Sequence, residues 1–581
     1  MAILPPKARR RKRTRARDRN RQLLRRRRRR LLDRIAHRSE PEREDPMITA
    51  ANIHSELGQR THGLAAGGIG ALLLVARRTG LIAAIDHDLH LLKRHLPYHE
   101  SDHVLNIAFN LLAGGRRLEH LELRRNDEVY LDALGAVRVP DPTTAGDFCR
   151  RFDEADVLAL MRAINTARLR VYAQQPAAFF GEATLDIDGT LVGTDAECKE
   201  GVDIAYDGTW GYHPLVVTLA NTGEPLFLAN RPGNRPSHEG APSYIDEAIA
   251  LCQRAGFRRI ALRGDTDFSQ TAHLDRWGAL EGVRFLFGMG VNPALMALAA
   301  GLPAEAYAFL ERPPKYEIRT APRRRPEHVK AEVVRRRGFE TIHTLEEMVA
   351  EFDYRPTACR ASYRVVVLRK RLGIDKGSVR MREEYRYFFF ITNDREAAAD
   401  ELVLEANGRC DQENVIAQLK GGVRALQAPV GDTVSNWAYM VMASLAWTLK
   451  AWAALLLPEE PRGAEEHRAE RRSWLRMEFA TFRAAVIELP CQVVRGGGRL
   501  IYRLLSWDPW QGALRRLVER LRGGWLSSGA ARKSGSGCPD PCGPPSEERG
   551  SAMAERRTGA ATGGGTSGQE KLRIEPEHSL M

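Results

Sequence analysis

The order of strand-like and helix-like segments after Ala183 is the feature that most limits which fold this chain can adopt. Three short apolar runs come first: "TLDIDGTLV", "HPLVVTLANTG" and "EPLFLANRPG". Turn residues separate them at hairpin-length spacing, which predicts an antiparallel meander. A helix ending at Gly256, a buried strand "RRIALRGDTDF", a second helix and the strand "VRFLFGMG" are predicted to follow. A doubly wound parallel sheet is not predicted, because parallel neighbours need helical crossovers between them.

Two aspartates alternate at the end of the first of these runs, and the sequence leaves their roles open. Asp186 and Asp188 fall on one face of a strand, because alternate residues share a face. The stretch "DIDGT" resembles the first motif of the haloacid dehalogenase phosphatases, in which Asp186 would be a nucleophile. That resemblance fails later, since Phe268 and Ser269 stand where a further aspartate is required. One or both carboxylates could also cap a turn at Gly189.

A meander followed by helix, strand, helix and strand is the element order of the ribonuclease H-like fold, an α/β architecture. In that fold an aspartate on the first strand lies beside one at the end of the fourth, which here selects Asp188 and Asp265. A third acidic residue comes from a later helix. Three carboxylates form a hard-oxygen site suited to Mg²⁺. Two such ions can activate water and stabilise a leaving 3′ oxygen.

The third acid is predicted from helical spacing in "NGRCDQENVIAQLK". Glu413 lies four residues after Arg409 and seven before Lys420, which places all three on one stripe of a helix. Glu413 can then face the metals, while Lys420, about two turns further on, reaches a DNA phosphate. An ordinary surface ion pair between Arg409 and Glu413 has the same spacing and stays open at this point.

The chain from about Met47 to Trp510 carries, in one order, the motifs "DPTTAGDFCRRF", "LDIDGT", "GYHPL", "NRPGN", "LRGDTDF", "YRYFFFITN", the helix with Arg409, Glu413 and Lys420, and "LAWTLKAW". This series resembles the DDE transposases of bacterial insertion sequences, specifically the insertion-sequence 1380 kind, also called transposase DDE group 1. The resemblance implies a ribonuclease H-like catalytic core with a β-rich insertion at residues 305–384, before the final catalytic helix. It also implies that the catalytic, metal-binding residues are Asp188, Asp265 and Glu413.

The resemblance implies a DNA transposase that binds the terminal inverted repeats of its element, frees 3′ hydroxyls and joins them to target DNA. Two Mg²⁺ ions are implied, replaceable by Mn²⁺, with Asp265 shared by both and Asp188 and Glu413 holding one. A homodimer or higher multimer is implied, because two element ends must be brought together. The candidate DNA contacts are Arg409, Lys420, Arg231 and Asn234, the last two in "NRPGN" just past a strand end.

The chain departs from the family pattern at two places, and these departures leave an alternative function open. Ala406 stands where the family signature has a tyrosine, three residues before Arg409. Asp267 stands where the family usually has a glycine after the fourth strand. Loss of the tyrosine removes a contact to flanking DNA, and an extra carboxylate near the metals could disturb them. A catalytically inactive DNA-binding relic is therefore one alternative, and a haloacid dehalogenase-like phosphatase is another.

The positive charge of the chain is concentrated at its N-terminus. Residues 1–46 hold 19 Lys/Arg and 6 Asp/Glu, out of a net charge of +14 for the whole chain. Such a run predicts a disordered segment that binds any polyanion. Because the composition becomes ordinary at Met47, translation from Met1 or from Met47 stays open. The sequence shows neither a signal peptide nor a bilayer-spanning run, so a cytoplasmic, nucleoid-associated protein without membrane contact is expected.

Composition and periodicity predict six successive segments: a disordered Arg-rich tail at 1–46, a helical DNA-binding region at 47–177, the first part of the core at 178–304, the insertion at 305–384, the second part of the core with the catalytic helix at 385–526, and a disordered tail at 527–581.

Overall fold

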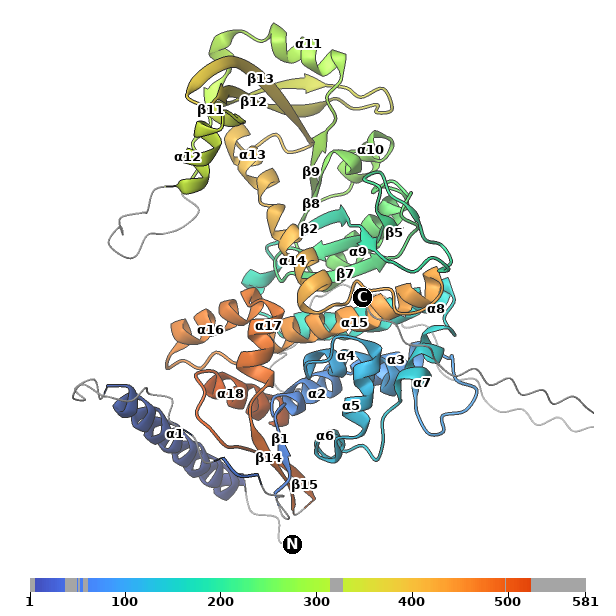
Figure 1. Ribbon diagram of the computed structural model, residues 1–581, viewed down its shortest axis with the longest axis vertical. Helices are drawn as coiled ribbons and strands as arrows, with labels where there is room; N and C mark the ends of the chain where they lie inside the picture. The colour runs from blue at the N-terminus through green and yellow to red at the C-terminus, as the bar shows by residue number, and fades with distance from the viewer. Residues whose placement is uncertain are drawn as a thin grey trace, which may run out of the picture. The chain divides into compact units, whose positions relative to one another are not determined.

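The protein has a mixed α/β fold in which helical regions precede and follow one large mixed sheet (Figure 1). Within the described residues the sheet has nine strands, in the order β10-β11-β12-β13-β9-β8-β2-β6-β7. The computed structural model describes residues 6–36, 50, 53–55, 61–313, 328–496 and 498–523.

The segments with strand-like alternation form one end of this sheet. β2 is parallel to β8, which is parallel to β9, whereas β6 is antiparallel to β2 and β7 is antiparallel to β6. The meander therefore folds to one side of β2, and the strands reached through helical crossovers fold to its other side. These strands are β2 (Glu182–Gly189), β6 (Leu215–Leu219), β7 (Glu224–Ala229), β8 (Arg259–Gly264) and β9 (Val283–Met289).

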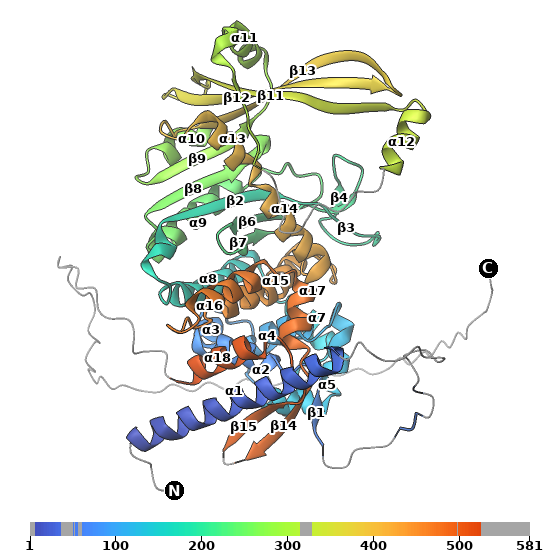
Figure 2. The same cartoon turned by 90° about the vertical axis from the view of Figure 1, so that its left-hand side faces the viewer.

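The crossover helix α9 (Ala241–Ala255) connects β7 to β8 and packs against β2, β6 and β7. It ends at Gly256, as its sequence predicts, with a φ of +96° that favours glycine. α10 (Thr271–Gly278) then connects β8 to β9. After the insertion, α13 (Ala399–Asn407) packs against β9, and α14 (Cys410–Ala417) packs against β2 (Figure 2).

The insertion continues the core sheet. It contains three long antiparallel strands, of which β13 pairs with β9 through four residues, from Phe389↔Met289 to Thr392↔Leu286. A boundary at 384/385 is wrong, because it falls inside β13, whose first half is mostly exposed and whose last residues are mostly buried. The change from charged to aromatic residues marks that change in burial within one strand. The three strands are β11 (Glu340–Tyr354), β12 (Tyr363–Lys376) and β13 (Val379–Thr392).

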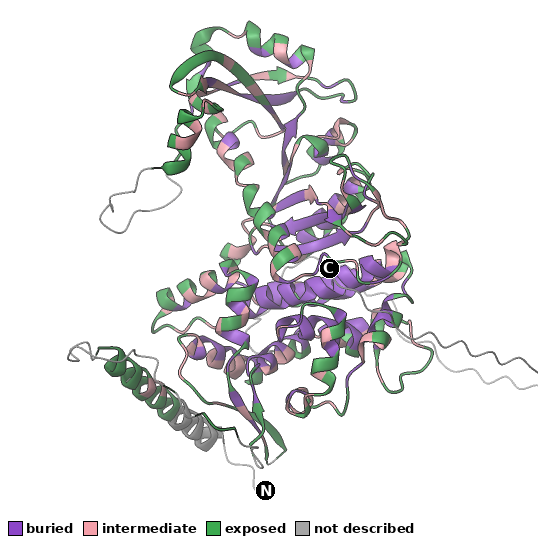
Figure 3. Ribbon diagram, viewed as in Figure 1, coloured by how far each residue is buried: buried purple, intermediate pink, exposed green. Residues whose placement is uncertain are grey.

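Helix α15 (Thr433–Leu455) forms the centre of the core on the side of β7. Nearly every residue in it is buried, and it packs against α4 (Glu100–Leu112), α8 (Glu154–Tyr172) and β7 (Figure 3). Within the described residues it is the one helix long and apolar enough to cross a bilayer, and that apolar stretch is entirely enclosed by the protein. Its tryptophans Trp437, Trp447 and Trp452 are buried in the core.

Lys450 on α15 gives a testable dependence of stability on pH. Its side chain is 1% exposed, and its ammonium lies 3.8 Å from the centre of the Trp447 ring and donates to the Leu475 carbonyl. Burial lowers the pKa of Lys450 to about 7, from an ordinary value of 10.5. Between these pH values the unfolded chain binds a proton that the folded chain has lost. The depressed pKa of Lys450 therefore makes the folded protein more stable as pH rises.

We expect Lys450→Met to remove this contribution of Lys450 to the pH dependence of stability. From pH 7.5 to 9.5 the wild type should gain about 2 kcal/mol of unfolding free energy relative to the variant. The measurement is urea unfolding at three pH values in that window. Lys376→Met, at an exposed position at the end of β12, serves as control and should keep the wild-type slope. Equal slopes for Lys450→Met and wild type would show that Lys450 does not titrate there.

The disorder expected for residues 1–46 is wrong for helix α1 (Pro6–Ala36). Its described residues are almost all exposed (Figure 3), and Arg27 donates to the carbonyls of Leu504 and Ser506, both at 3.2 Å. The expectation rested on the run of positive charges, but arginine and leucine favour helix locally without a core. The expectation of disorder for 527–581 concerns residues outside the described part of the chain.

Candidate active site

The pairing of β2 with β8 places Asp188 and Asp265 next to each other. The last parallel pair between these strands is Ile187↔Gly264, and each aspartate is the next residue of its chain. The side chain of Asp188 is 16% exposed. Asp265 caps the short helix η3 (Thr266–Phe268) and accepts a hydrogen bond from the Asp267 N–H at 3.0 Å. Two chain segments 77 residues apart thus bring two carboxylates to one edge of the sheet.

Asp186 has a structural role, which settles the alternative that the sequence leaves open. It is 0% exposed, and its two oxygens accept from Arg263 Nε at 2.7 Å and Nη2 at 2.8 Å. The same guanidinium donates through Nη1 to the Glu405 carbonyl at the end of α13. A carboxylate enclosed in this way cannot attack a phosphate, so the phosphatase hypothesis is excluded. Arg263 ties β2, β8 and α13 together beside the candidate site.

Helix α14 crosses this edge of the sheet and is fastened by Gln412. The Gln412 side chain is 1% exposed, and its Nε2 donates to the backbone carbonyls of Asp186 and Val216 at 3.0 and 3.1 Å. α13 ends at Asn407, and Gly408 is its C-cap before α14 begins at Cys410. A Cβ added at Gly408 would lie 2.9 Å from Arg263 Nη1, so the close approach to that guanidinium requires glycine.

The predicted stripe of Arg409, Glu413 and Lys420 lies next to the two aspartates, but the Glu413 carboxylate points away from a common ligand set with them. Arg409 Nη1 donates to Asp188 Oδ2 at 3.0 Å, while Arg409 and Glu413 are 4.0 Å apart. The Glu413 side chain is 61% exposed. In the described part of the chain, these three carboxylates do not bring three oxygens within 4.8 Å of one another. Lys420 lies past α14 in a short π-helix, Gln418–Gly422.

The electrostatics of this edge are those of a cation site. Burial raises the pKa of Asp188 to about 6, with a further rise from the charge of Asp265 and an opposing effect of Arg409. Burial also raises the pKa of Asp265, and the charge of Asp267 adds to it. Burial lowers the pKa of Lys420, although Asp188 and Asp207 oppose that shift. Neighbouring carboxylates that are this reluctant to ionise are stabilised as anions by a divalent cation, and oxygen donors suit a hard one.

The predicted DNA contacts Arg231 and Asn234 lie in a loop beside β2. Arg231 donates through Nε to the His213 carbonyl and through Nη1 to three further carbonyls at residues 236–239. Burial lowers its pKa to about 10. Asn234 is exposed in the turn. His213, whose carbonyl accepts from Arg231, lies against the end of β2. A Cβ added to Gly189, the last residue of β2, would lie 2.7 Å from His213 Nε2. Contact of either residue with DNA stays a prediction.

Arg263 and Gln412 hold the site together, and neither residue is predicted from the sequence. A signal for Arg263 was present, because it lies two residues before Asp265 and therefore faces the same side of the sheet as Asp186 and Asp188 once β2 and β8 pair. Gln412 carried no such signal, since its partners are backbone carbonyls of two strands far away in the sequence.

Comparison with known proteins identifies the family of the chain. No curated protein matches the chain. Among solved structures, the cryo-EM structure of the piggyBac transposase synaptic complex with hairpin DNA is similar with a TM-score of 0.32 and 10% sequence identity, over 73% of this chain and 81% of that chain. The profile of the transposase DDE domain group 1 family matches residues 62–524. The chain therefore belongs to the transposase DDE domain group 1 family and is a DDE transposase.

Proposed function

We propose that this DDE transposase serves a bacterial insertion sequence of the 1380 kind, binds the terminal inverted repeats of that element, and cuts and joins DNA strands with Mg²⁺. The observation that carries the proposal is the parallel pairing of β2 with β8, which sets Asp188 beside Asp265 under α14. The strand order β9-β8-β2-β6-β7, with β2 central and β6 antiparallel to it, supports a ribonuclease H-like core. Work on DNA implies a cytoplasmic, nucleoid-associated location.

Asp188, Asp265 and Glu413 would hold the metal, and Mg²⁺ is favoured because every donor is a carboxylate oxygen. When bound, it supplies activation of water and charge stabilisation at the leaving 3′ oxygen. Arg409 pairs with Asp188 and keeps it oriented and partly neutralised in the free protein. Glu413, one helical turn further on, is exposed beside Arg409 and would turn toward the two aspartates to complete the ligand set. Asp265 is held in place by its cap of η3.

DNA would approach this edge past Lys420. Its ammonium is half-buried and lies close enough to Asp188 to feel the charge of that carboxylate. A cation held there can contact a phosphate next to the scissile bond and offset the repulsion between DNA and the carboxylates. Two element ends must meet for strand transfer, so a homodimer or higher multimer on DNA is part of the proposal.

Lys420→Ala is expected to weaken binding to the element end and to reduce the slope of log affinity against log salt by about one unit, because one phosphate contact is lost. The measurement is end binding at several salt concentrations. Arg468→Ala on α16 (Ala464–Arg476), an exposed position, is the charge-matched control and should leave the slope unchanged. An unchanged slope and affinity for Lys420→Ala would assign Lys420 to a solvated surface.

The experiment that tests the proposed function uses a supercoiled plasmid carrying the DNA ends that flank the gene, incubated with the protein and Mg²⁺. Excision of the segment between the ends, dependent on Mg²⁺, is the expected result. Specific end binding without any cutting would support a catalytically inactive DNA-binding relic instead. Absence of both end binding and cutting would contradict the proposal.

Asp267 favours keeping the inactive relic as a second candidate. It adds a negative charge two residues after Asp265, and this charge raises the pKa of Asp265 further. Its backbone N–H also holds Asp265 Oδ1. If end binding occurs without cutting, Asp267→Gly should separate the causes. Recovery of cutting would identify the extra carboxylate as the inactivating change, and continued inactivity would point elsewhere, for example to the loss of tyrosine at Ala406.

A further inference from the structure

A second cluster of metal-ligating side chains lies far from the aspartates in the sequence, in the helical region before the sheet. The loop 89–99 connects α3 (Leu81–Asp88) to α4. His95 and His99 in this loop and Glu100, the first residue of α4, bring their ligand atoms within 4.8 Å of one another. In the described part of the chain no other group of three His, Cys, Asp or Glu side chains does so.

Glu100 has a carboxylate oxygen that needs a partner. Its side chain is 0% exposed, and Oε1 accepts hydrogen bonds from the Leu91 and Leu92 N–H groups at 3.1 and 2.9 Å. Oε2 is buried and makes no hydrogen bond. His95 Nε2 lies 3.2 Å from Oε2, close enough for an ion pair but without hydrogen-bond geometry. A buried carboxylate oxygen in this state is costly unless a cation satisfies it.

The two histidines lie on the open side of this oxygen. Their rings stack with centroids 4.5 Å apart and 17° between their planes, and the side chain of His95 is 48% exposed. Two imidazoles and one carboxylate form a donor set for a borderline transition metal such as Zn²⁺, whereas Mg²⁺ and Ca²⁺ take oxygen ligands. The exposed side leaves room for water to complete the coordination shell.

We propose that His95, His99 and Glu100 bind a divalent transition metal of the Zn²⁺ class, which fastens the loop 89–99 to the start of α4. Glu100 is already anchored to the loop through Leu91 and Leu92, so the metal would add a second attachment at the other end of the loop. This site differs in donor chemistry from the carboxylates at Asp188 and Asp265, and it does not depend on the proposed function.

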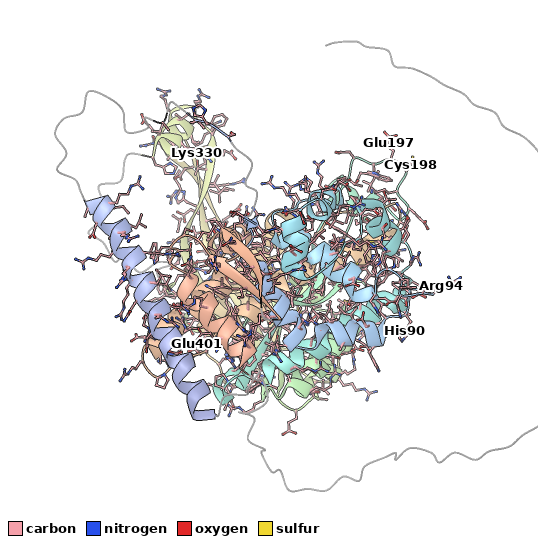
Figure 4. The ribbon with its side chains drawn as sticks, turned by 90° about the horizontal axis from the view of Figure 1, so that it is seen from below. His90, Arg94, Glu197, Cys198, Lys330 and Glu401 are labelled. Atoms are coloured by element: carbon pink, nitrogen blue, oxygen red, sulfur yellow. The ribbon has the colours of Figure 1, made fainter. Side chains whose placement is uncertain are left out.

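Fastening the loop would fix one wall of a basic cavity of about 800 Å³. Lys93, Arg94 and Tyr98 come to this cavity from the loop, and Figure 4 shows Arg94 at the outer edge of the molecule. Arg138 lies over the ring of Tyr98, 5.8 Å from its centre. The metal would therefore hold the loop's cationic side chains in a set position relative to the arginines that line the cavity from outside the loop, Arg125, Arg138 and Arg151.

The test is Zn²⁺ binding by the full chain, purified without a histidine tag and kept in excess Mg²⁺ so that the all-carboxylate site is occupied. Wild type is expected to bind one Zn²⁺ that His95→Ala and His99→Ala each bind more than about 100-fold more weakly, since loss of even an outer-shell partner costs 10–100-fold. His90→Ala, an exposed histidine of the same loop shown in Figure 4, is the matched control and should bind as wild type. Equal binding by all four proteins, or no Zn²⁺ bound by wild type, would overturn the proposal.

Limited trypsin digestion provides a readout of the loop itself. Zn²⁺ should slow cleavage after Lys93 and Arg94 in wild type and in His90→Ala, because a fastened loop cannot enter the protease. It should give no protection in His95→Ala or His99→Ala. These variants change exposed residues, so a folding failure is not expected, and circular dichroism verifies it. Protection by Zn²⁺ in the His95→Ala and His99→Ala variants would place the metal elsewhere and contradict the assignment.

Discussion

Asp188→Asn, Asp265→Asn and Glu413→Gln are each expected to reduce strand cleavage by on the order of a thousandfold or more, while binding to the element ends stays close to wild type. A neutral amide of the same shape keeps the packing of β2, β8 and α14 but cannot supply the charge that holds a divalent ion. The measurement is Mg²⁺-dependent nicking of a labelled DNA end, with end binding followed on the same proteins.

A carboxylate on the same helix provides the matched control. Asp411 is exposed on α14, two residues from Glu413, and Asp411→Asn should cut at the wild-type rate.

The choice of Asp188 rather than Asp186 as the metal ligand has its own test. If Asp188→Asn retained cutting while Asp186→Asn lost it without loss of fold, the metal ligand would be Asp186. The buried pairing of Asp186 with Arg263 predicts instead that Asp186→Asn acts through stability.

Glu224→Ala is expected to lower the free energy of unfolding by about 3–5 kcal/mol, because it leaves a buried guanidinium without its counter-charge. Glu224 is 0% exposed and Arg168 is 1% exposed, with 3.0 Å between Arg168 Nε and Glu224 Oε1. The carboxylate also accepts from Tyr172 Oη at 2.9 Å and from Trp452 Nε1 at 2.8 Å. It thereby joins β7 to α8 and α15. The measurement is thermal or urea unfolding followed by circular dichroism.

Two further variants make this result specific to the buried pair. Glu247→Ala on α9 removes an exposed glutamate and should change stability by less than about 0.5 kcal/mol. The double variant Arg168→Met/Glu224→Leu removes both charges and should be more stable than Glu224→Ala alone, since no unpaired buried charge remains. A double variant at least as unstable as Glu224→Ala would mean that packing around Tyr172 and Trp452, rather than charge, sets the cost.

Most elements of the core were predictable because each has a local cause. Short apolar runs bounded by turn residues identified the strands that became β2, β6, β7, β8 and β9, and Gly256 marked the end of α9. Local sequence did not determine which residue caps the start of a helix. In "DPTT" the residues Asp141, Thr143 and Thr144 all have side chains that can cap a helix, and Asp141 is the N-cap of α7 (Pro142–Cys149), where it accepts from the Thr144 N–H. All three residues can cap, and the backbone path into the helix selects one.

The candidate site divides in the same way. The sequence by itself determined which residue types are available: two alternating aspartates at a strand end, an aspartate after a later strand, and an acid with basic neighbours on a helix. Only the tertiary structure decided that Asp186 is a buried structural partner of Arg263. Alternation puts both aspartates on one face, so the difference between them depends on β8 and α13, which pair and pack from far along the chain. Strand register and helix packing are long-range contacts, and the free energy that fixes them is not encoded in any local stretch of residues.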